Sequence, residues 1–402
     1  QDSIVAARQA EQERNHAGQN IVHADTIIPV APSQEITAIA TPESDSLQEA
    51  TLRDQLAYFA NAATGEDRSL SIESDRLRLS VSTKGGFIES VELKNYKTSS
   101  QEPLMLFVEE NNVFDLKFYS ENRLIGTQGL YFTPYINGEI VLNNDSIVLS
   151  ENDSINLALR LYTDTHTPEN PKYLEWVYII KGNDYMLDVH LNTVGLQDVI
   201  ASNSTLLSLS WGIDVPRQEK SRKNELAGTT VLFKFPGEAV EKLRETRDEI
   251  ENITSSLNWV SFKQQFFSSV LIAQNNFSSG ELTTTSFDET NEDFLRRMTA
   301  SLDIPYNSRE NNHFPMSFYF GPNHFQTLKA YGLDLESQIN LGWALMGWIN
   351  RFIVIPVFNY LDGFNLNYGI IILILTIMLK IVLFPIAYKT YLSSARMKVL
   401  KP

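Results

Sequence analysis

A single lysine, Lys380, lies near the middle of the only membrane-length apolar run of this chain, residues 366–392. A charged side chain near the centre of a bilayer costs about 3 kcal/mol or more, so an ionisable residue there indicates a functional site. Thr376 precedes Lys380 by four residues, which places it one helical turn away. The pair is therefore our candidate for a polar, cationic site within a membrane.

A helix formed by this run aligns further polar residues with the pair. At 100° per residue, Thr376 and Lys380 fall within a stripe about 60° wide. The same stripe holds Tyr391 and Ser394, about three and four turns further along the chain from Lys380. The opposite side carries aliphatic residues and methionine, which suit lipid or another helix. We therefore predict Tyr391 and Ser394 as further lining residues of the candidate site.

An alternative explanation of Lys380 is that its ammonium reaches the lipid headgroups. Lys389, the next basic residue, lies nine positions later, or about 13 Å along a helix axis. A lysine side chain spans part of that distance, so its ammonium could reach the headgroup region without any polar cavity. The sequence leaves both explanations open, a wet cavity or contact with the headgroups.

The charges of the chain are divided unevenly along its length. The net charge is −16, and the residues from Leu341 onward contribute six basic and one acidic side chain, or +5, which leaves −21 for the first 340 residues. An acidic surface argues against nucleic acid as a direct partner. The sequence contains no cysteine, which excludes disulfides and thiolate metal sites.

Orientation follows from the residues that flank the apolar run. Four basic residues lie on its C-terminal side: Lys389, Arg396, Lys398 and Lys401. The preceding side carries Asp362 instead. Positive charge favours the cytoplasmic side, so we expect a cytoplasmic C-terminal end and a large domain outside, which in a bacterium means the periplasm.

The large domain reads as a succession of short strands. From Ser69 apolar and polar residues alternate, and Lys84-Gly85-Gly86 separates two alternating runs, a pattern typical of a β-hairpin. Further strands are expected at 113–119, 139–149, 154–162, 173–181, 185–194 and 204–213. Such spacing without long helices predicts a mainly β, antiparallel sandwich.

Three further segments have distinct patterns. The highly charged residues 237–252 are expected to form a solvated surface helix, because Glu238 and Lys242 have helix-stabilising spacing. Residues 259–273 are rich in aromatic and branched side chains and are expected to form a core strand or buried turn. Residues 317–332 are expected to form the last strand, a Gly-Pro turn and a short helix.

These patterns divide the chain into six parts. The first residue is Gln1 and no apolar leader follows, so we expect a removed signal or anchor, or a fragment. The aromatic residues of 339–363, interrupted by polar ones, favour a helix lying in the headgroup region. The expected parts are a flexible or partly helical tether (1–68), a β-sandwich (69–325), a linker helix (326–338), an interfacial amphipathic helix (339–363), a transmembrane helix (366–389) and the start of a basic cytoplasmic segment (390–402).

Enzymatic activity is the main competing class, and the sequence gives it little support. The residues that could supply acid–base chemistry are His166, His190, His313 and His324, with Asp188 or Glu175. They are scattered, and no two histidines have the spacing of metal ligands. We therefore expect no enzyme, no catalytic residue, no metal and no cofactor. A membrane-anchored domain that binds carbohydrate or peptide remains the alternative function.

The sequence resembles the YidC family of membrane protein insertases, in the bacterial form with a large periplasmic domain. The resemblance covers nearly all of residues 70–402. Its most specific parts are LRLSVSTKGGFIESVEL, WVSFKQQFFSSVLI, FYFGP, GWALMGWINRFIVIPVF and LTIMLKIVLFPIAYKTYLSSARMKVLKP. The resemblance implies a periplasmic β-supersandwich similar to galactose-mutarotase-like folds, an interfacial helix, and the first core transmembrane helix.

The resemblance also gives Lys380 a role. In that family a basic residue five positions before a proline faces a hydrophilic groove, and Lys380 stands five positions before Pro385. Many members carry arginine there, so lysine keeps the charge and loses the bidentate fork. Thr376 matches a polar residue of the groove. The cation is expected to attract acidic residues of a substrate, and no bond is broken.

The partners implied by the resemblance are proteins and lipid. They are nascent membrane proteins, subunits of the Sec translocon, the ribosome (through parts outside this chain) and the phospholipid bilayer. The resemblance places such a protein in the bacterial inner membrane.

Overall fold

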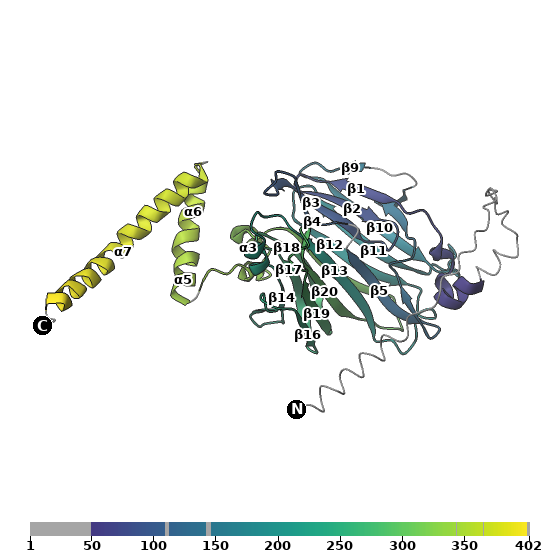
Figure 1. Ribbon diagram of the computed structural model, residues 1–402. Coiled ribbons are helices and arrows are strands. Elements are labelled where there is room, and N and C mark those ends of the chain that lie inside the picture. Colours follow the sequence, from purple (N-terminus) through teal and green to yellow (C-terminus); the bar gives the residue numbers. More distant parts are fainter. Residues whose placement is uncertain (1–49, 109–111, 142–145, 343, 365, 400–402) are drawn as a thin grey trace, which may run out of the picture. The chain divides into compact units, whose positions relative to one another are not determined.

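The computed structural model describes residues 50–108, 112–141, 146–342, 344–364 and 366–399 (Figure 1). The segment 1–49, most of the predicted tether, lies outside the described residues. All described strands fall between residues 69 and 322, and long helices follow them. The predicted fold class, a mainly β antiparallel sandwich followed by apolar helices, is confirmed.

The largest sheet has ten strands and lies across the whole domain. Its members, in spatial order, are β15 (Val240–Lys242), β14 (Thr230–Lys234), β17 (Leu257–Lys263), β18 (Phe267–Phe277), β21 (Asn312–Pro322), β12 (Met186–Val194), β11 (Tyr173–Lys181), β10 (Ser154–Tyr162), β7 (Thr133–Ile136) and β8 (Glu139–Ile140). All of its pairs are antiparallel. Along β12 every second residue is buried, because successive side chains point to opposite faces.

Two smaller sheets complete the domain. The five-stranded sheet contains β4 (Pro103–Phe107), β3 (Ile88–Lys97), β2 (Leu77–Ser82), β1 (Ser69–Glu73) and β9 (Ser146–Val148). The six-stranded sheet contains β16 (Glu249–Ile253), β19 (Gly280–Ser286), β20 (Phe294–Pro305), β13 (Leu206–Pro216), β5 (Val113–Ser120) and β6 (Arg123–Gly126). Among the described strands, β9 alone pairs in parallel, with β1.

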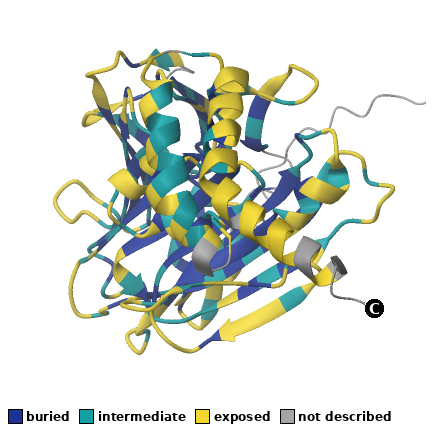
Figure 2. Cartoon of the chain, turned by 90° about the vertical axis from the view of Figure 1, so that its left-hand side faces the viewer, coloured by how far each residue is buried: buried dark blue, intermediate teal, exposed yellow. Residues whose placement is uncertain are grey.

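Aromatic side chains join the smaller sheets to the large one. Trp211 of β13 stacks on Phe262 of β17 with ring centroids 3.9 Å apart. From the five-stranded sheet, Phe107 packs edge-on against Phe320 of β21 at 5.6 Å. Such pairs stabilise a core by about 1 kcal/mol beyond the area they bury. Figure 2 shows the result, buried strands within the sandwich and helices whose residues are mostly exposed or of intermediate burial.

The predicted hairpin at residues 77–97 is confirmed as β2 and β3. Gly85 and Gly86, between these strands, have φ angles of +79° and +69°, a region that glycine adopts without strain. A Cβ on Gly86 would also lie 3.0 Å from the Phe132 ring. Backbone conformation and close packing therefore both require glycine at this position.

The predicted surface helix over residues 237–252 is wrong. The segment instead forms β15 and β16, which lie at the edges of two different sheets. Gly237 turns the chain with a φ of +76°, and the buried Leu243 donates its N–H to the carbonyl of Val231 at 2.9 Å. Charged residues protect edge strands from pairing with other molecules, so a run of charge fits edge strands as well as a solvated helix.

The predictions for the two remaining segments, 259–273 and 317–332, agree with the structure. The aromatic-rich stretch from 259 to 273 forms two buried strands, β17 and β18, which pair with each other. The last strand, β21, ends at Pro322, and the short helix α4 (Phe325–Ala330) follows it. A second short helix, α3 (Arg222–Ala227), is capped by the hydroxyl of Ser221.

Residues 323–338, which we call the strap, are held against the outer face of the large sheet. The indole N–H of Trp259 donates to the carbonyl of Leu333 at 3.0 Å. The Tyr331 hydroxyl donates to Asp184 at 2.6 Å. Besides α4, the strap contains a 3-10 turn, η4 (Leu335–Gln338). Two of its leucines, Leu328 and Leu335, are fully buried. The strap therefore belongs to the folded domain.

The end of the predicted tether also packs against the domain. Residues 50–56 are helical, and two 3-10 turns follow, η1 (Ala57–Phe59) and η2 (Asn61–Ala63). Phe59 is fully buried and meets Phe118 of β5 edge-on at 5.5 Å. The Asp164 carboxylate accepts the N–H of Asn61 at 2.9 Å.

Candidate functional site

The helix that carries Lys380 is α7 (Tyr368–Val399), which continues through Pro385 without interruption. Residues Tyr368–Pro385 have a mean hydropathy of 2.4 over 18 residues, enough in length and composition to cross a membrane. Two of these residues, Ile371 and Leu375, are buried, and the rest of the segment is largely exposed. A helix so apolar around its whole circumference is stable when lipid or other helices surround it.

Thr376 and Lys380 lie on α7 as predicted, one turn apart and both exposed. The Thr376 hydroxyl donates to the carbonyl of Ile372 at 2.7 Å, so its hydrogen is satisfied within the helix and its oxygen can still accept. Among the described residues, Lys380 has no carboxylate within ion-pair distance.

Tyr391 and Ser394 lie on the same helix, beyond Pro385, and both are exposed. Tyr391 is 82% exposed and lines a shallow apolar hollow of about 350 Å³ with Phe384, Tyr388 and other neighbours. The continuous helix keeps these residues in the register that the 100° rotation predicts. The role of the four residues in a groove remains a prediction.

The predicted interfacial helix begins at α5 (Ala344–Ile349) and runs through the π-helical turn η5 (Asn350–Val354) into α6 (Ile355–Asp362). The π turn ends at Val354, and Pro356 lies in the first turn of α6. A proline has no N–H to donate to a helical hydrogen bond. Trp348, Phe352 and Tyr360 are each more than half exposed. Exposed aromatic residues of this kind suit the headgroup region of a bilayer.

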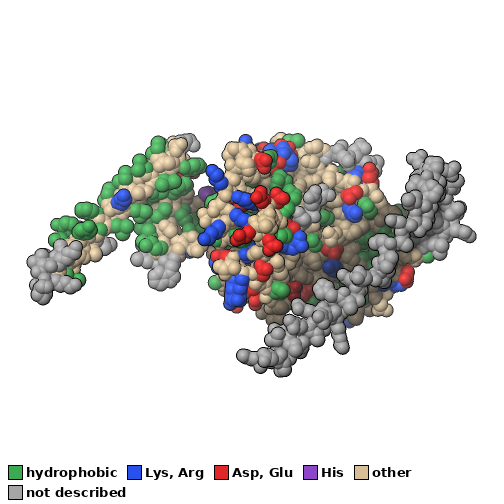
Figure 3. All heavy atoms as spheres, in the orientation of Figure 1, with side chains coloured by type: hydrophobic (Ala, Val, Ile, Leu, Met, Phe, Trp, Pro, Cys, Tyr) green, Lys and Arg blue, Asp and Glu red, His purple; other side chains and the backbone are tan. Residues whose placement is uncertain are grey.

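The composition of the surface changes along the chain. Figure 3 shows hydrophobic side chains over α5 to α7 and many charged side chains over the β domain. Phe358 of α6 stacks on Tyr368 of α7 at 6.0 Å, which joins the two helices near their connection. The apolar surface thus lies over the helices, and the charged side chains of both signs lie mainly over the β domain.

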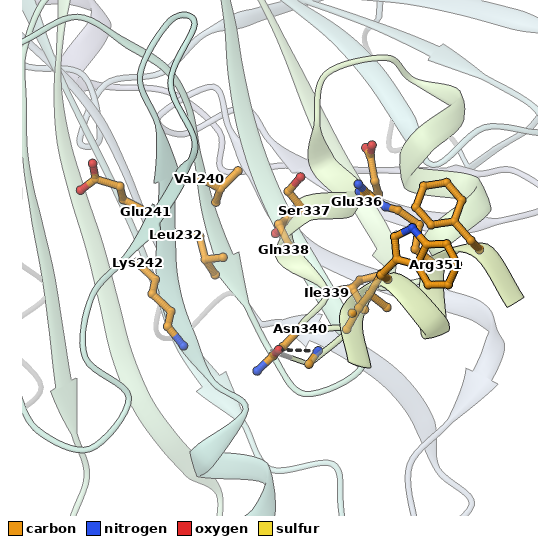
Figure 4. Close-up of a pocket in the computed structure, with 15 residues that line it drawn as sticks. Leu232, Val240, Glu241, Lys242, Glu336, Ser337, Gln338, Ile339, Asn340 and Arg351 are labelled. Atoms are coloured by element: carbon orange, nitrogen blue, oxygen red, sulfur yellow. Dashed lines mark hydrogen bonds between the residues drawn. The ribbon is translucent and has the colours of Figure 1, made fainter. Parts of the chain in front are cut away.

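A hollow of about 660 Å³ lies where the strap meets β15 and the start of the helices (Figure 4). Its lining includes Lys242 and Arg351, but also Glu241 and Glu336. The Arg351 guanidinium also lies over the Phe325 ring of α4, 5.7 Å from its centre. Charges of both signs line this hollow, so it has no preference for one type of ion.

The histidines considered for acid–base chemistry are less scattered than the sequence indicated. The rings of His190 and His313 meet edge-on at 5.0 Å, and His166 contacts Tyr162 at 4.2 Å on the same face of the large sheet. His324 lies apart, at the start of α4, beside Thr327. The sequence could not show this grouping, because the residues come from strands far apart in the chain.

The carboxylates near these histidines are already engaged. One oxygen of Glu175 accepts from Arg160 at 2.7 Å, and the other accepts from the Asn192 amide at 2.9 Å. A second carboxylate, Asp188, accepts from the Ser317 hydroxyl at 3.0 Å. Within the described part of the chain, no group of three or more His, Asp or Glu residues has a geometry that could hold a metal ion. Glu175 is therefore fixed as a hydrogen-bond acceptor and is badly placed to act as a general base.

The observations above define a class of protein: a mainly β domain followed by a helix long and apolar enough to cross a membrane. The sequence model described as the YidC periplasmic domain matches residues 69–356. The chain belongs to the YidC family, as the sequence resemblance indicated.

Relatives named membrane protein insertase YidC are identical to this chain at about a third of the aligned positions. The protein of Parabacteroides distasonis is 35% identical over 367 residues, which cover 89% of this chain and 55% of the relative. A protein of Porphyromonas gingivalis is 33% identical over 410 residues, covering 100% of this chain and 60% of the relative. The chain thus spans a little over half the length of these relatives.

Two solved structures illustrate the structural comparison. A crystal structure of an active YidC insertase with its first transmembrane domain resolved is 14% identical, with a TM-score of 0.32, over 84% of this chain and 60% of that one. A galactose mutarotase-like protein from Lactobacillus casei is 9% identical, with a TM-score of 0.39, over 63% of this chain and 99% of that one.

Proposed function

We propose that this chain is part of an insertase that helps new inner-membrane proteins enter and fold in the bilayer. The family match carries this proposal, because it covers the β domain and reaches the helical segment before α7. The insertase names of the relatives support it. In this proposal the β domain lies in the periplasm and the end of α7 in the cytoplasm.

The proposed mechanism depends on the polar stripe of α7. Lys380 lies 12 residues after Tyr368 and five before Pro385, so it stands about 18 Å from one end of the apolar segment and about 8 Å from the other. A wet cavity at that depth shortens the apolar barrier that a polar substrate segment must cross. The ammonium of Lys380 would attract acidic residues of that segment. Thr376 would offer it a hydroxyl oxygen one turn away.

The proposed partners follow from this mechanism. They are nascent membrane proteins, the bilayer, the Sec translocon and the ribosome, the last through parts of the protein outside this chain. The step requires binding and transfer alone, so no catalytic residue is assigned. Nucleic acid is not proposed as a direct partner, because the β domain is acidic.

Complementation in cells depleted of the insertase tests the proposal. The full reading frame that contains this chain would carry Lys380→Arg or Lys380→Glu. We expect Lys380→Arg to support insertion of a small phage coat-type protein with an acidic translocated segment, because the positive charge is kept. We expect Lys380→Glu to reduce that insertion by about ten-fold or more, because like charges repel.

The control is a coat-type substrate whose translocated segment has its acidic residues neutralised. Its insertion should depend much less on the charge at position 380. Equal insertion of the acidic substrate by both variants would remove Lys380 from the mechanism. Normal insertion in depleted cells without any complementing gene would remove the insertase function itself.

A further inference from the structure

A straight row of polar side chains crosses the outer face of the ten-stranded sheet. Its members come from β21, β12, β11, β10 and β7, where they pair directly in register: His313, Asn192, Glu175, Arg160 and Thr133. Neighbouring strands lie about 4.8 Å apart, so the row is about 19 Å long. On the same strands, the residues next to row members, such as Leu174 beside Glu175 and Leu191 beside Asn192, are buried in the core. The row therefore lies on the side of the sheet that is turned away from the other two sheets.

Hydrogen bonds fix the orientation of each planar group in this row. His313 and Asn192 are linked at 2.7 Å, Asn192 and Glu175 at 2.9 Å, and Glu175 and Arg160 at 2.7 Å. Glu175 is 93% buried, whereas His313 is exposed. Planar groups held in this way present donors and acceptors in fixed directions, which favours recognition of a ligand with several hydroxyls.

Aromatic rings surround the Arg160 end of the row. The guanidinium of Arg160 lies between the rings of Tyr135 and Tyr173, 4.5 and 4.9 Å from their centres. The hydroxyls of Tyr135 and Tyr162 are hydrogen-bonded at 2.8 Å, and His166 stacks beside Tyr162. Burial and the bond to Tyr135 raise the pKa of Tyr162 to about 12, so this phenol stays neutral at physiological pH.

A hollow lies directly beside these rings. It encloses about 400 Å³ and is lined by Thr133 of the row and Tyr162, together with Asn61, Glu66 and Arg68 from the segment that leads into β1. Cavities that hold small ligands start at about 300 Å³. The hollow and the row together have room for a ligand of one or two rings.

The charged groups of the row balance each other and do not favour an ionic ligand. Arg160 is neutralised by Glu175, and the pKa of His190 is lowered by burial and by the neighbouring His313, so His190 is neutral at pH 7. Neutral imidazole, amide and phenol groups both donate and accept hydrogen bonds, as sugar hydroxyls do. The exposed parts of the tyrosine rings can pack against the C–H face of a pyranose.

We infer that this face is a binding site for a neutral saccharide, with Tyr162 and Tyr173 against its ring and the row from His313 to Arg160 bonded to its hydroxyls. The site is independent of the membrane helix and adds a second binding function to the proposed insertase. It would tie the domain to glycan outside the membrane without any chemical step.

Binding of simple glycosides to the full 402-residue chain in deuterated detergent tests this site. The probes are the methyl β-pyranosides of glucose, galactose and N-acetylglucosamine, and methyl β-glucuronide serves as the anionic probe. Saturation-transfer NMR at about 10 mM ligand detects complexes whose Kd lies in the millimolar range. We expect transfer to at least one neutral pyranoside and much less to the glucuronide.

Two variants locate the binding and one serves as a matched control. Tyr173→Ala removes a ring, and Arg160→Lys keeps the charge but loses the planar fork. Each should weaken binding by about ten-fold. Tyr119→Ala removes a tyrosine that is 54% exposed on the six-stranded sheet and should leave binding unchanged.

The melting temperature of each variant separates binding from stability. If no saturation transfer to any neutral pyranoside is detected, the inference is overturned. Transfer that persists in Tyr173→Ala and Arg160→Lys would overturn the proposed location. Binding of an uncharged extended tetrapeptide to this face, in place of the sugars, would show that the row serves a peptide. Lower melting temperatures without any binding would show that the row only stiffens the sheet.

Discussion

At the scale of single residues, the chemistry of the membrane segment concentrates on Lys380. Its position on an exposed face of α7 agrees with two arrangements, a wet groove or an ammonium that reaches the headgroups. The two differ in where the backbone of residue 380 lies, because a long side chain can carry its charge away from a dry position. A short side chain at the same position would report the local environment directly.

Cysteine labelling in the membrane distinguishes these arrangements. The chain has no natural cysteine, so each single-cysteine variant reports without background. If residue 380 faces a wet groove, Thr376→Cys and Lys380→Cys should react with a water-soluble maleimide at least about ten times faster than a lipid-facing cysteine, because the thiolate forms in water. The measurement is the rate of labelling in intact membranes.

Ile381→Cys is the matched control, since that residue lies about 100° around the helix from Lys380. Slow labelling at all three positions would show that Lys380 serves as a headgroup anchor. Fast labelling at all three would show that the helix is surrounded by water on every side.

At the scale of elements, the edge segment 237–253 shows how two structures can share one sequence pattern. Its charges have helical spacing, yet Leu243 is 2% exposed and Ile250 is 62% exposed. The first lies just beyond β15 with its side chain in the core, and the second points outward from β16. If the segment were a solvated helix, substitutions at both positions would have little effect on stability.

The pair Leu243→Ala and Ile250→Ala makes this difference measurable. Leu243→Ala should lower the free energy of unfolding by about 2–4 kcal/mol, because it leaves a cavity in the core. Ile250→Ala should change it by less than about 0.5 kcal/mol, as an exposed substitution does. Chemical denaturation of the β domain gives both values, and equal effects would contradict the observed packing.

The strands could be predicted where apolar and polar residues alternate visibly. The pairing between strands far apart in sequence could not be predicted. The hairpin at β2 and β3 follows from period-two residues around two glycines, a local signal. The polar row places Arg160 beside Glu175 and Asn192 beside His313, the latter 121 residues apart. Nothing local in the sequence sets that register, so the histidines appeared scattered. Lys380 was found because a charge in an apolar run is itself a local signal.

At the scale of the whole molecule, the β domain has its own core and the strap is part of it. Trp259 and Tyr319 are both fully buried, and the strap covers the outer face of the sheet at these residues. The buried leucines of the strap add to the same cluster. The described helices after residue 343 contribute only Ile371 and Leu375 to the buried hydrophobic residues.

Two truncated chains test this division. A chain ending at Asn340 keeps the strap and should be soluble without detergent, with a melting temperature within a few degrees of the full chain's domain. A chain ending at Pro322 loses the strap and exposes Trp259 and Tyr319. Its free energy of unfolding should fall by about 3 kcal/mol or more, the contribution of a large buried side chain. Equal melting of the two truncated chains would contradict a structural role for the strap.

The strap follows directly from β21, which lies between β18 and β12 in the interior of the ten-stranded sheet. A mechanical load applied to the membrane end would consequently arrive at an interior strand, where ladders of hydrogen bonds on both sides share it, and not at a weakly held edge. A pull on the helical end would therefore load the whole ten-stranded sheet and not a single edge strand.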